Sequence, residues 1–184
     1  TAGGRATGVE SDDGLLEADA VVVAGGAWSA GLAGLPPLRT RIKPMAGQIL
    51  RWESRPPRLR RVVYGCQGYV VPRPDGRVLM GSTLEDRGFD KAVTLAGVQR
   101  IANMGMALVP GLGEGRFDGA WAGLRPATGD GLPLLGGCAV AGLYFAAGHY
   151  RNGILLTPIT ARVIRDLVMG DPPPVDVTPF HPGL

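Results

Sequence analysis

A short run of apolar residues near the start of the chain, residues 21–24, is followed at once by Gly25 and Gly26. An uninterrupted apolar run of this length is typical of a strand buried on both faces of a parallel sheet. Glycines at the end of such a strand let the backbone turn tightly and approach a ligand closely. A purely structural strand has the same pattern. The run therefore predicts a parallel sheet and leaves a ligand at its edge open.

A second junction of this kind lies near the other end of the chain. Residues 145–158 read as a strand, a polar turn between Gly148 and Gly153, and the start of a helix. The first N–H groups of a helix have no partner within the helix and favour an anion. Arg151 in the turn adds positive charge. An ordinary strand-to-helix connection is the alternative.

Arg125 ends an apolar strand and is followed by Pro126. A guanidinium is costly to bury unless an anion meets it, and its forked donors suit a carboxylate. The residue types alone leave two partners open. These are the carboxylate of a bound molecule and a nearby acid such as Asp130.

The rest of the pattern predicts an α+β fold with a mixed sheet and two main helices. A strong turn at residues 74–76 joins two strands into a hairpin, and apolar residues at helical spacing follow Thr94, a suitable cap. We expect strands at residues 5–10, 21–24, 41–52, 62–64, 69–72, 78–82, 119–124, 132–135 and 143–146, and helices at 27–32, 94–108 and 154–169.

Composition excludes several classes of protein. Hydrophobic residues make up 45% of the 184 residues and charged ones 19%, as in a globular domain. The net charge of +3 comes largely from a basic stretch at residues 39–61, which we interpret as a solvated face because no nucleic-acid motif accompanies it. No apolar run approaches the roughly 20 residues of a membrane span, and no signal peptide is evident.

The cysteines and histidines predict neither a disulfide framework nor a metal site. Cys66 and Cys138 are far apart, and only His149 and His181 provide imidazoles. We expect reduced thiols in a cytoplasmic protein. The chain also begins without methionine and enters directly into strand-like sequence, which we interpret as the start of a fragment.

Several motifs together resemble the C-terminal half of the glycine oxidase family, within the D-amino-acid oxidase and sarcosine oxidase superfamily of FAD-dependent oxidoreductases. They occupy residues 69–73, 78–84, 123–126, 129–133 and 148–156, and the resemblance extends over nearly the whole chain.

The resemblance implies roles for individual residues. Arg125 and Arg151 would bind the substrate carboxylate, and Tyr69 would add a hydroxyl to the same site. The residues that would contact the flavin are Gly25, Gly26, His149, Tyr150, Arg151, Asn152, Gly153, Ile154 and Leu155. The helix N-terminus would stabilise negative charge on the reduced ring.

The resemblance also implies the reaction and its partners. Glycine, sarcosine or a small D-amino acid would lose hydride to FAD, and molecular oxygen would reoxidise the flavin to give hydrogen peroxide. A link to thiamine synthesis is implied as well. We expect that the protein binds no nucleic acid and has no membrane span. Whether it forms a homo-oligomer stays open.

The same resemblance divides the chain into three segments. Residues 1–34 would be the last strands of a Rossmann-like FAD-binding domain, 35–120 the substrate-binding domain, and 121–184 the return to the FAD-binding domain. No G-x-G-x-x-G motif opens the chain, so the pyrophosphate site is expected on other sequence and the isolated chain is expected to be inactive.

Some positions depart from the family pattern. Leu84 replaces an expected pocket methionine, and Gln67 stands where a histidine is possible. The turn that carries a flavin-linked cysteine in sarcosine oxidases has none here, which favours noncovalent FAD. Two other functions stay open: a flavin-dependent D-amino-acid dehydrogenase with another electron acceptor, and a non-catalytic binding or assembly module.

Overall fold

A computed structural model describes residues 3–53, 59–65 and 67–183. Cys66 and the part of the basic stretch at residues 54–58 lie outside them. The chain forms two compact units. The first holds the residues before Met45 and those from Arg125 onward, and the second is Met45–Leu124. Each unit has its own sheet and helix, as the predicted α+β class requires.

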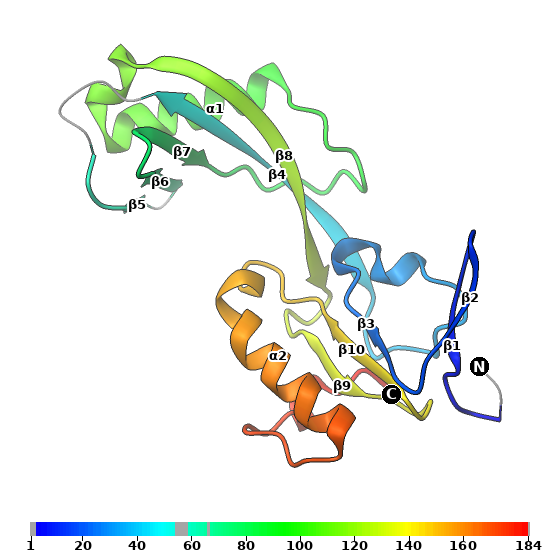
Figure 1. Cartoon of the computed structure of the whole chain (residues 1–184). Helices are drawn as coiled ribbons and strands as arrows, with labels where there is room; N and C mark the ends of the chain where they lie inside the picture. The colour runs from blue at the N-terminus through cyan, green and yellow to red at the C-terminus, as the bar shows by residue number, and fades with distance from the viewer. Residues whose placement is uncertain (1–2, 54–58, 66, 184) are drawn as a thin grey trace. The chain divides into compact units, whose positions relative to one another are not determined.

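The first unit is built on a three-stranded mixed sheet in the order β3-β10-β9. The strands are β3 (Val21–Val23), β10 (Leu143–Ala147) and β9 (Leu134–Gly137). β3 and β10 run parallel although they lie far apart in the sequence, with Val22 opposite Tyr144. The parallel sheet predicted from the apolar run is therefore confirmed, although the sequence did not indicate which strand pairs with β3 (Figure 1). The prediction that β3 is buried on both faces was wrong, because 41% of the Val22 surface is exposed.

Helix α2 (Gly153–Met169) packs against β9 and β10 in the first unit (Figure 1). It ends at Gly170, which has a left-handed φ of 78° and stops the helix as a C-terminal glycine commonly does. The core beneath it contains Phe145 and Leu134, both fully buried. The predicted helix over residues 154–169 is confirmed.

Smaller elements complete this unit. They are the hairpin of β1 (Gly8–Ser11) and β2 (Gly14–Glu17), and two 3-10 helices, η1 (Gly26–Gly31) and η3 (Thr178–Phe180). The short helix predicted at residues 27–32 is present as the 3-10 helix η1. Leu35-Pro36-Pro37 follows closely, which leaves too few residues for a stable α-helix.

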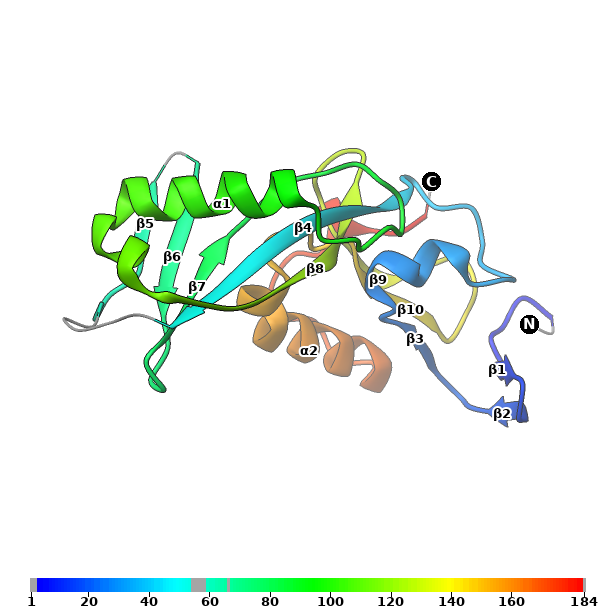
Figure 2. The ribbon, with the colours of Figure 1, turned by 90° about the horizontal axis from the view of Figure 1, so that it is seen from above.

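The second unit is built on a five-stranded sheet in the order β5-β6-β7-β4-β8, of which residues 42–44 of β4 and 125–128 of β8 belong to the first unit. Its strands are β4 (Ile42–Glu53), β5 (Val63–Gly65), β6 (Gly68–Pro72), β7 (Arg77–Gly81) and β8 (Arg116–Thr128). β6 and β7 form the predicted antiparallel hairpin, in which Tyr69 faces Gly81 and Pro72 faces Val78. Helix α1 (Leu95–Leu108) lies along this sheet (Figure 2), and η2 (Pro110–Glu114) follows it.

A buried polar group joins α1 to the sheet. Thr94 caps the helix by accepting a hydrogen bond from the N–H of Gly97, as predicted. The side chain of Gln48 on β4 is fully buried. It donates to the Thr94 hydroxyl at 3.1 Å and accepts from the Thr94 N–H at 3.0 Å. These bonds fix the start of α1 to the middle of β4.

Strand β8 is longer than the sequence predicted. It continues past Leu124 through Pro126 to Thr128, although proline lacks the N–H of a strand ladder. β8 lies at the edge of its sheet, where proline is tolerated within a strand. Within the described residues, no helix is long and apolar enough to cross a bilayer.

Candidate functional site

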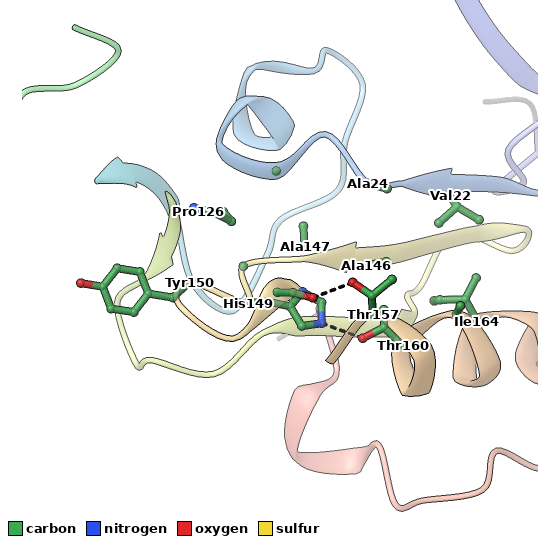
Figure 3. A pocket seen from close by; sticks show the side chains of 14 residues that line it. Val22, Ala24, Pro126, Ala146, Ala147, His149, Tyr150, Thr157, Thr160 and Ile164 are labelled. Atoms are coloured by element: carbon green, nitrogen blue, oxygen red, sulfur yellow. Dashed lines mark hydrogen bonds between the residues drawn. The ribbon is translucent and has the colours of Figure 1, made fainter. Parts of the chain in front are cut away.

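A pocket of about 420 Å³ lies in the first unit. It opens where the carboxyl ends of β3 and β10 meet the first turns of α2 (Figure 3). Its lining residues come from β3 and the glycines after it, from the end of β8, from the β10–α2 turn and from one face of α2. They are Val22, Ala24, Gly26, Pro126, Ala146, Ala147, Gly148, His149, Tyr150, Gly153, Thr157, Thr160, Ala161 and Ile164.

The turn between β10 and α2 has a backbone that few residues can adopt. Gly148 is buried and has φ of 79°, and a Cβ added there would lie 2.7 Å from Cγ2 of Thr128. Tyr150 also has positive φ, 51°, and its N–H donates to the carbonyl of Pro126 at 3.0 Å. The turn is therefore fixed by its own backbone and by β8.

The N-terminus of α2 borders the pocket. Asn152 is the N-cap residue, but among the described residues its side chain accepts no capping hydrogen bond from the helix. The first turn also carries no acidic residue. The N–H groups at this end thus keep their donor capacity and their partial positive charge, which together favour a negatively charged or electron-rich ligand.

His149 links the turn to α2. One of its ring nitrogens, Nε2, lies 3.0 Å from the Thr160 hydroxyl, as the dashed line in Figure 3 marks. Burial lowers the pKa of His149 below its ordinary value of 6.5. The imidazole is therefore neutral at pH 7 and adds no charge to the pocket wall.

The two predicted arginines lie in the same unit as the pocket. Arg151 is exposed, and its Cζ lies 5.4 Å from the centre of the Tyr150 ring, a cation–π distance. Arg125 lies partly buried on β8, one residue before Pro126. Asp130, the acid named as an alternative partner for Arg125, forms an ion pair with Arg39.

The structure brings together only some of the predicted flavin contacts. Gly26, His149, Tyr150 and Gly153 line the pocket. Gly25 precedes Gly26 and packs against Ser29. The remaining predicted contacts, Arg151, Asn152, Ile154 and Leu155, are exposed in the same segment and are absent from the pocket lining formed by the described residues.

Two of these exposed residues are apolar. Ile154 is 93% exposed and Leu155 is 79% exposed at the start of α2. Tyr69 belongs to the second unit, on β6. The flavin contacts assigned to the exposed residues and the substrate contact assigned to Tyr69 therefore stay predictions.

Sequence reasoning missed most of the α2 face of the pocket. Thr157, Thr160 and Ile164 line it together with Gly153, at intervals of four, three and four residues. This is the spacing of one helix face, and it was visible in the sequence. Val22 and Ala24 were also missed as lining residues, because the continuous apolar run hid the alternation of the strand.

Comparison with known proteins gives consistent matches. The family model DAO, described as FAD dependent oxidoreductase, matches residues 1–167. A glycine oxidase from Pseudomonas putida is 37% identical over 180 residues, covering 97% of this chain and 49% of that protein. A bifunctional protein ThiO/ThiG from Trichormus variabilis is 41% identical over 182 residues, covering 97% of this chain and 27% of that protein.

Solved structures agree with these matches. The crystal structure of glycine oxidase from Geobacillus kaustophilus superposes with a TM-score of 0.90 at 36% identity, covering 97% of this chain and 49% of that one. The chain thus spans about half the length of the glycine oxidases that it matches. The match over most of its residues confirms the predicted resemblance to the glycine oxidase family and the predicted fold class, and the chain belongs to the DAO family of FAD-dependent oxidoreductases.

Proposed function

We propose that this chain forms part of an FAD-dependent oxidase that deaminates glycine, sarcosine or small D-amino acids and produces hydrogen peroxide from oxygen. The observation that carries the proposal is the pocket at the ends of β3 and β10, bordered by the N-terminus of α2. Relatives named glycine oxidase support the choice of substrate class. A cytoplasmic location stays a prediction from the sequence.

The residues of the pocket fit part of an FAD molecule. Small side chains, among them Ala24, Ala146 and Ala161, leave room for a flat ring system. At Gly148 a side chain would collide with Thr128, so the backbone is bare where the turn meets the pocket. The N–H groups at the start of α2 would stabilise the negative charge that a flavin gains on reduction. When bound, FAD supplies the hydride acceptor.

The chain's own residues would bind and orient the substrate. The guanidinium groups of Arg125 and Arg151 would hold its carboxylate, and the Tyr69 hydroxyl would add a hydrogen bond. With the carboxylate held, the α C–H bond keeps one orientation toward the hydride acceptor. Because His149 is neutral, it places no positive charge in the pocket wall beside the substrate amine.

We also propose that the FAD is held without a covalent bond. Cys138 is a free thiol, and its sulfur faces the carbonyl oxygens of Val140 and Leu143, at 3.8 and 3.6 Å. It does not belong to the pocket lining formed by the described residues. Acid precipitation of the flavin-loaded protein should leave the flavin in the supernatant.

Steady-state kinetics of the flavin-loaded protein that contains this chain would test the substrate site. Arg151→Ala should lower kcat/KM for glycine by at least about 30-fold, since loss of one partner of a charge pair costs about 2–5 kcal/mol. The flavin absorbance should be retained. Arg100→Ala, which changes an exposed arginine on α1, is the matched control and should leave both quantities unchanged.

Two results would decide against the proposal. If glycine, sarcosine and D-alanine reduced the flavin without oxygen but no peroxide formed in air, the protein would be a dehydrogenase with another electron acceptor. If none of them reduced the flavin, and if the unit folded equally well without flavin, a non-catalytic module would be favoured.

A further inference from the structure

A row of residues crosses one face of the sheet in the second unit. Tyr64 on β5 faces Tyr69 on β6, Tyr69 faces Gly81 on β7, and Gly81 faces Ile49 on β4. Directly opposite residues on neighbouring strands share a face and lie close enough for their side chains to touch. The Tyr69 phenol therefore has a residue without a side chain as its neighbour on β7.

The phenol ring occupies the space that a side chain at position 81 would need. A Cβ built on Gly81 would lie 3.2 Å from the Tyr69 hydroxyl oxygen and 3.4 Å from Cζ of the same ring. It would lie 3.3 Å from Cγ1 of Ile49. Gly81 is itself buried. The hydroxyl end of Tyr69 is thus held across β7, beside Ile49.

The backbone of Gly81 does not require glycine. Its φ lies outside the left-handed region where only glycine is comfortable, unlike the φ of Gly68 or Gly76. A side chain at this position is therefore limited by the space that Tyr69 and Ile49 fill and not by the backbone angle. Glycine at this position is explained by the packing of the tyrosine.

We infer that Gly81 is a positioning residue for Tyr69: its missing side chain determines where the Tyr69 hydroxyl lies. The inference rests on the proposed function, in which this hydroxyl binds the substrate. A methyl group at position 81 would press on the phenol and move its oxygen. The contacts of 3.2–3.4 Å would be relieved by a shift of a few tenths of an ångström, which is enough to lengthen a hydrogen bond from the hydroxyl to the substrate.

A double-mutant cycle in the flavin-loaded protein that contains this chain tests the inference. Gly81→Ala should raise KM for glycine about tenfold, with a smaller change in kcat. Tyr69→Phe alone should also raise KM. In the Tyr69→Phe background, Gly81→Ala should change KM by less than about twofold, because the hydroxyl it displaces is gone.

Gly111→Ala is the matched control. Gly111 lies in η2 of the same unit, is exposed and has open space around its Cα, and its φ is not left-handed. Alanine there should leave KM unchanged. If Gly81→Ala does not fold, Ile49→Ala removes the opposite wall of the same space. It should raise KM several-fold in the presence of the hydroxyl and not in its absence.

The outcomes separate the inference from the proposed function. If Tyr69→Phe raises KM but Gly81→Ala does not, or if the two effects are additive, the positioning role is overturned while the substrate site stands. If Tyr69→Phe leaves KM unchanged, the substrate role of the tyrosine fails, and the positioning role of Gly81 falls with it.

Discussion

The imidazole Nε2 of His149 lies 3.0 Å from the hydroxyl oxygen of Thr160, so a ring in the β10–α2 turn is bonded to the helix that follows. Burial lowers the pKa of the ring. The folded protein therefore binds the proton of His149 less readily than the unfolded chain does. This difference couples the stability of the pocket wall to pH.

The free energy of unfolding should fall when the pH drops below the unfolded-state pKa of His149. Between that value, about 6.5, and the lower pKa of the folded state, the unfolded chain binds more protons, so acid favours unfolding. Below the folded-state pKa the loss is complete. Urea unfolding at pH 7.5 and 5.5 measures this loss of unfolding free energy. His149→Gln should lose less of it between the two pH values than the wild type does.

His181→Gln is the control for this prediction, because His149 and His181 are the only histidines. It should keep the wild-type dependence on pH. An equal acid loss in His149→Gln and in the wild type would show that other groups cause it.

Gly148→Ala should destabilise the first unit by about 2–4 kcal/mol. A left-handed φ costs a non-glycine residue about 1–2 kcal/mol, and a Cβ would also collide with Thr128 at 2.7 Å. Gly131→Ala separates the two causes, because Gly131 has a similar φ of 76° but open space around it. Thermal unfolding should show a larger loss for Gly148→Ala, and equal losses would contradict the collision.

Gln48→Leu should destabilise the second unit by roughly 3 kcal/mol, because it leaves buried partners without hydrogen bonds. Gln48 is fully buried and bonds Thr94 and the Glu85 carboxylate, the latter at 2.8 Å. The exposed Gln99→Leu on α1 is the control and should have little effect. Hydrogen exchange should locate the loss at the start of α1. Uniform loss across the unit would argue against a local role.

The carboxylate of Glu85 makes the stability contributed by the same hydrogen-bond network depend on pH. Although burial opposes the shift, hydrogen bonds from Thr83 and Gln48 and the charge of Arg87 lower its pKa. The ionised form therefore stabilises the fold above the ordinary pKa, and this stability is lost as the pH falls through the lowered value. In Glu85→Gln the unfolding free energy should fall less between pH 5 and pH 3 than in the wild type.

Arg39→Ala should loosen the C-terminal tail. The Arg39 side chain donates to the carbonyl oxygen of His181 at 2.9 Å and to that of Pro133 at 2.8 Å, and it pairs with Asp130. Limited proteolysis should cut the tail of the variant faster than that of the wild type. Arg41→Ala, an exposed neighbour, should behave as the wild type. Equal cutting rates in all three would show that other contacts hold the tail.

Local sequence was a reliable guide wherever neighbours along the chain determine the conformation. Helix α1 begins at its predicted cap, Thr94, because the hydroxyl bonds an N–H three residues away. The β6–β7 hairpin and the stop of α2 at Gly170 were predicted for the same reason. In each case the residues that determine the backbone lie within one turn of it.

The pocket depended on residues that are distant in the sequence. Val22 and Ala146 line it together only because β3 and β10 pair in parallel across some 120 intervening residues. The sequence suggested that both strands belong to a parallel sheet, but not that they are neighbours. Likewise, Asp130 was considered as a partner for the nearby Arg125, and the structure pairs it with Arg39.

The sequence by itself determined the secondary structure at caps and turns, the α+β class and the family, because these depend on residue types and on their spacing. Only the tertiary structure decided which side chains line the pocket and which glycines lack room for a side chain. Gly148 and Gly81 look alike in the sequence, yet Gly148 is constrained by its φ and by Thr128, whereas Gly81 is crowded only by the phenol of Tyr69 and by Ile49. Burial and contact depend on what lies across the space between strands, which sequence neighbours do not determine.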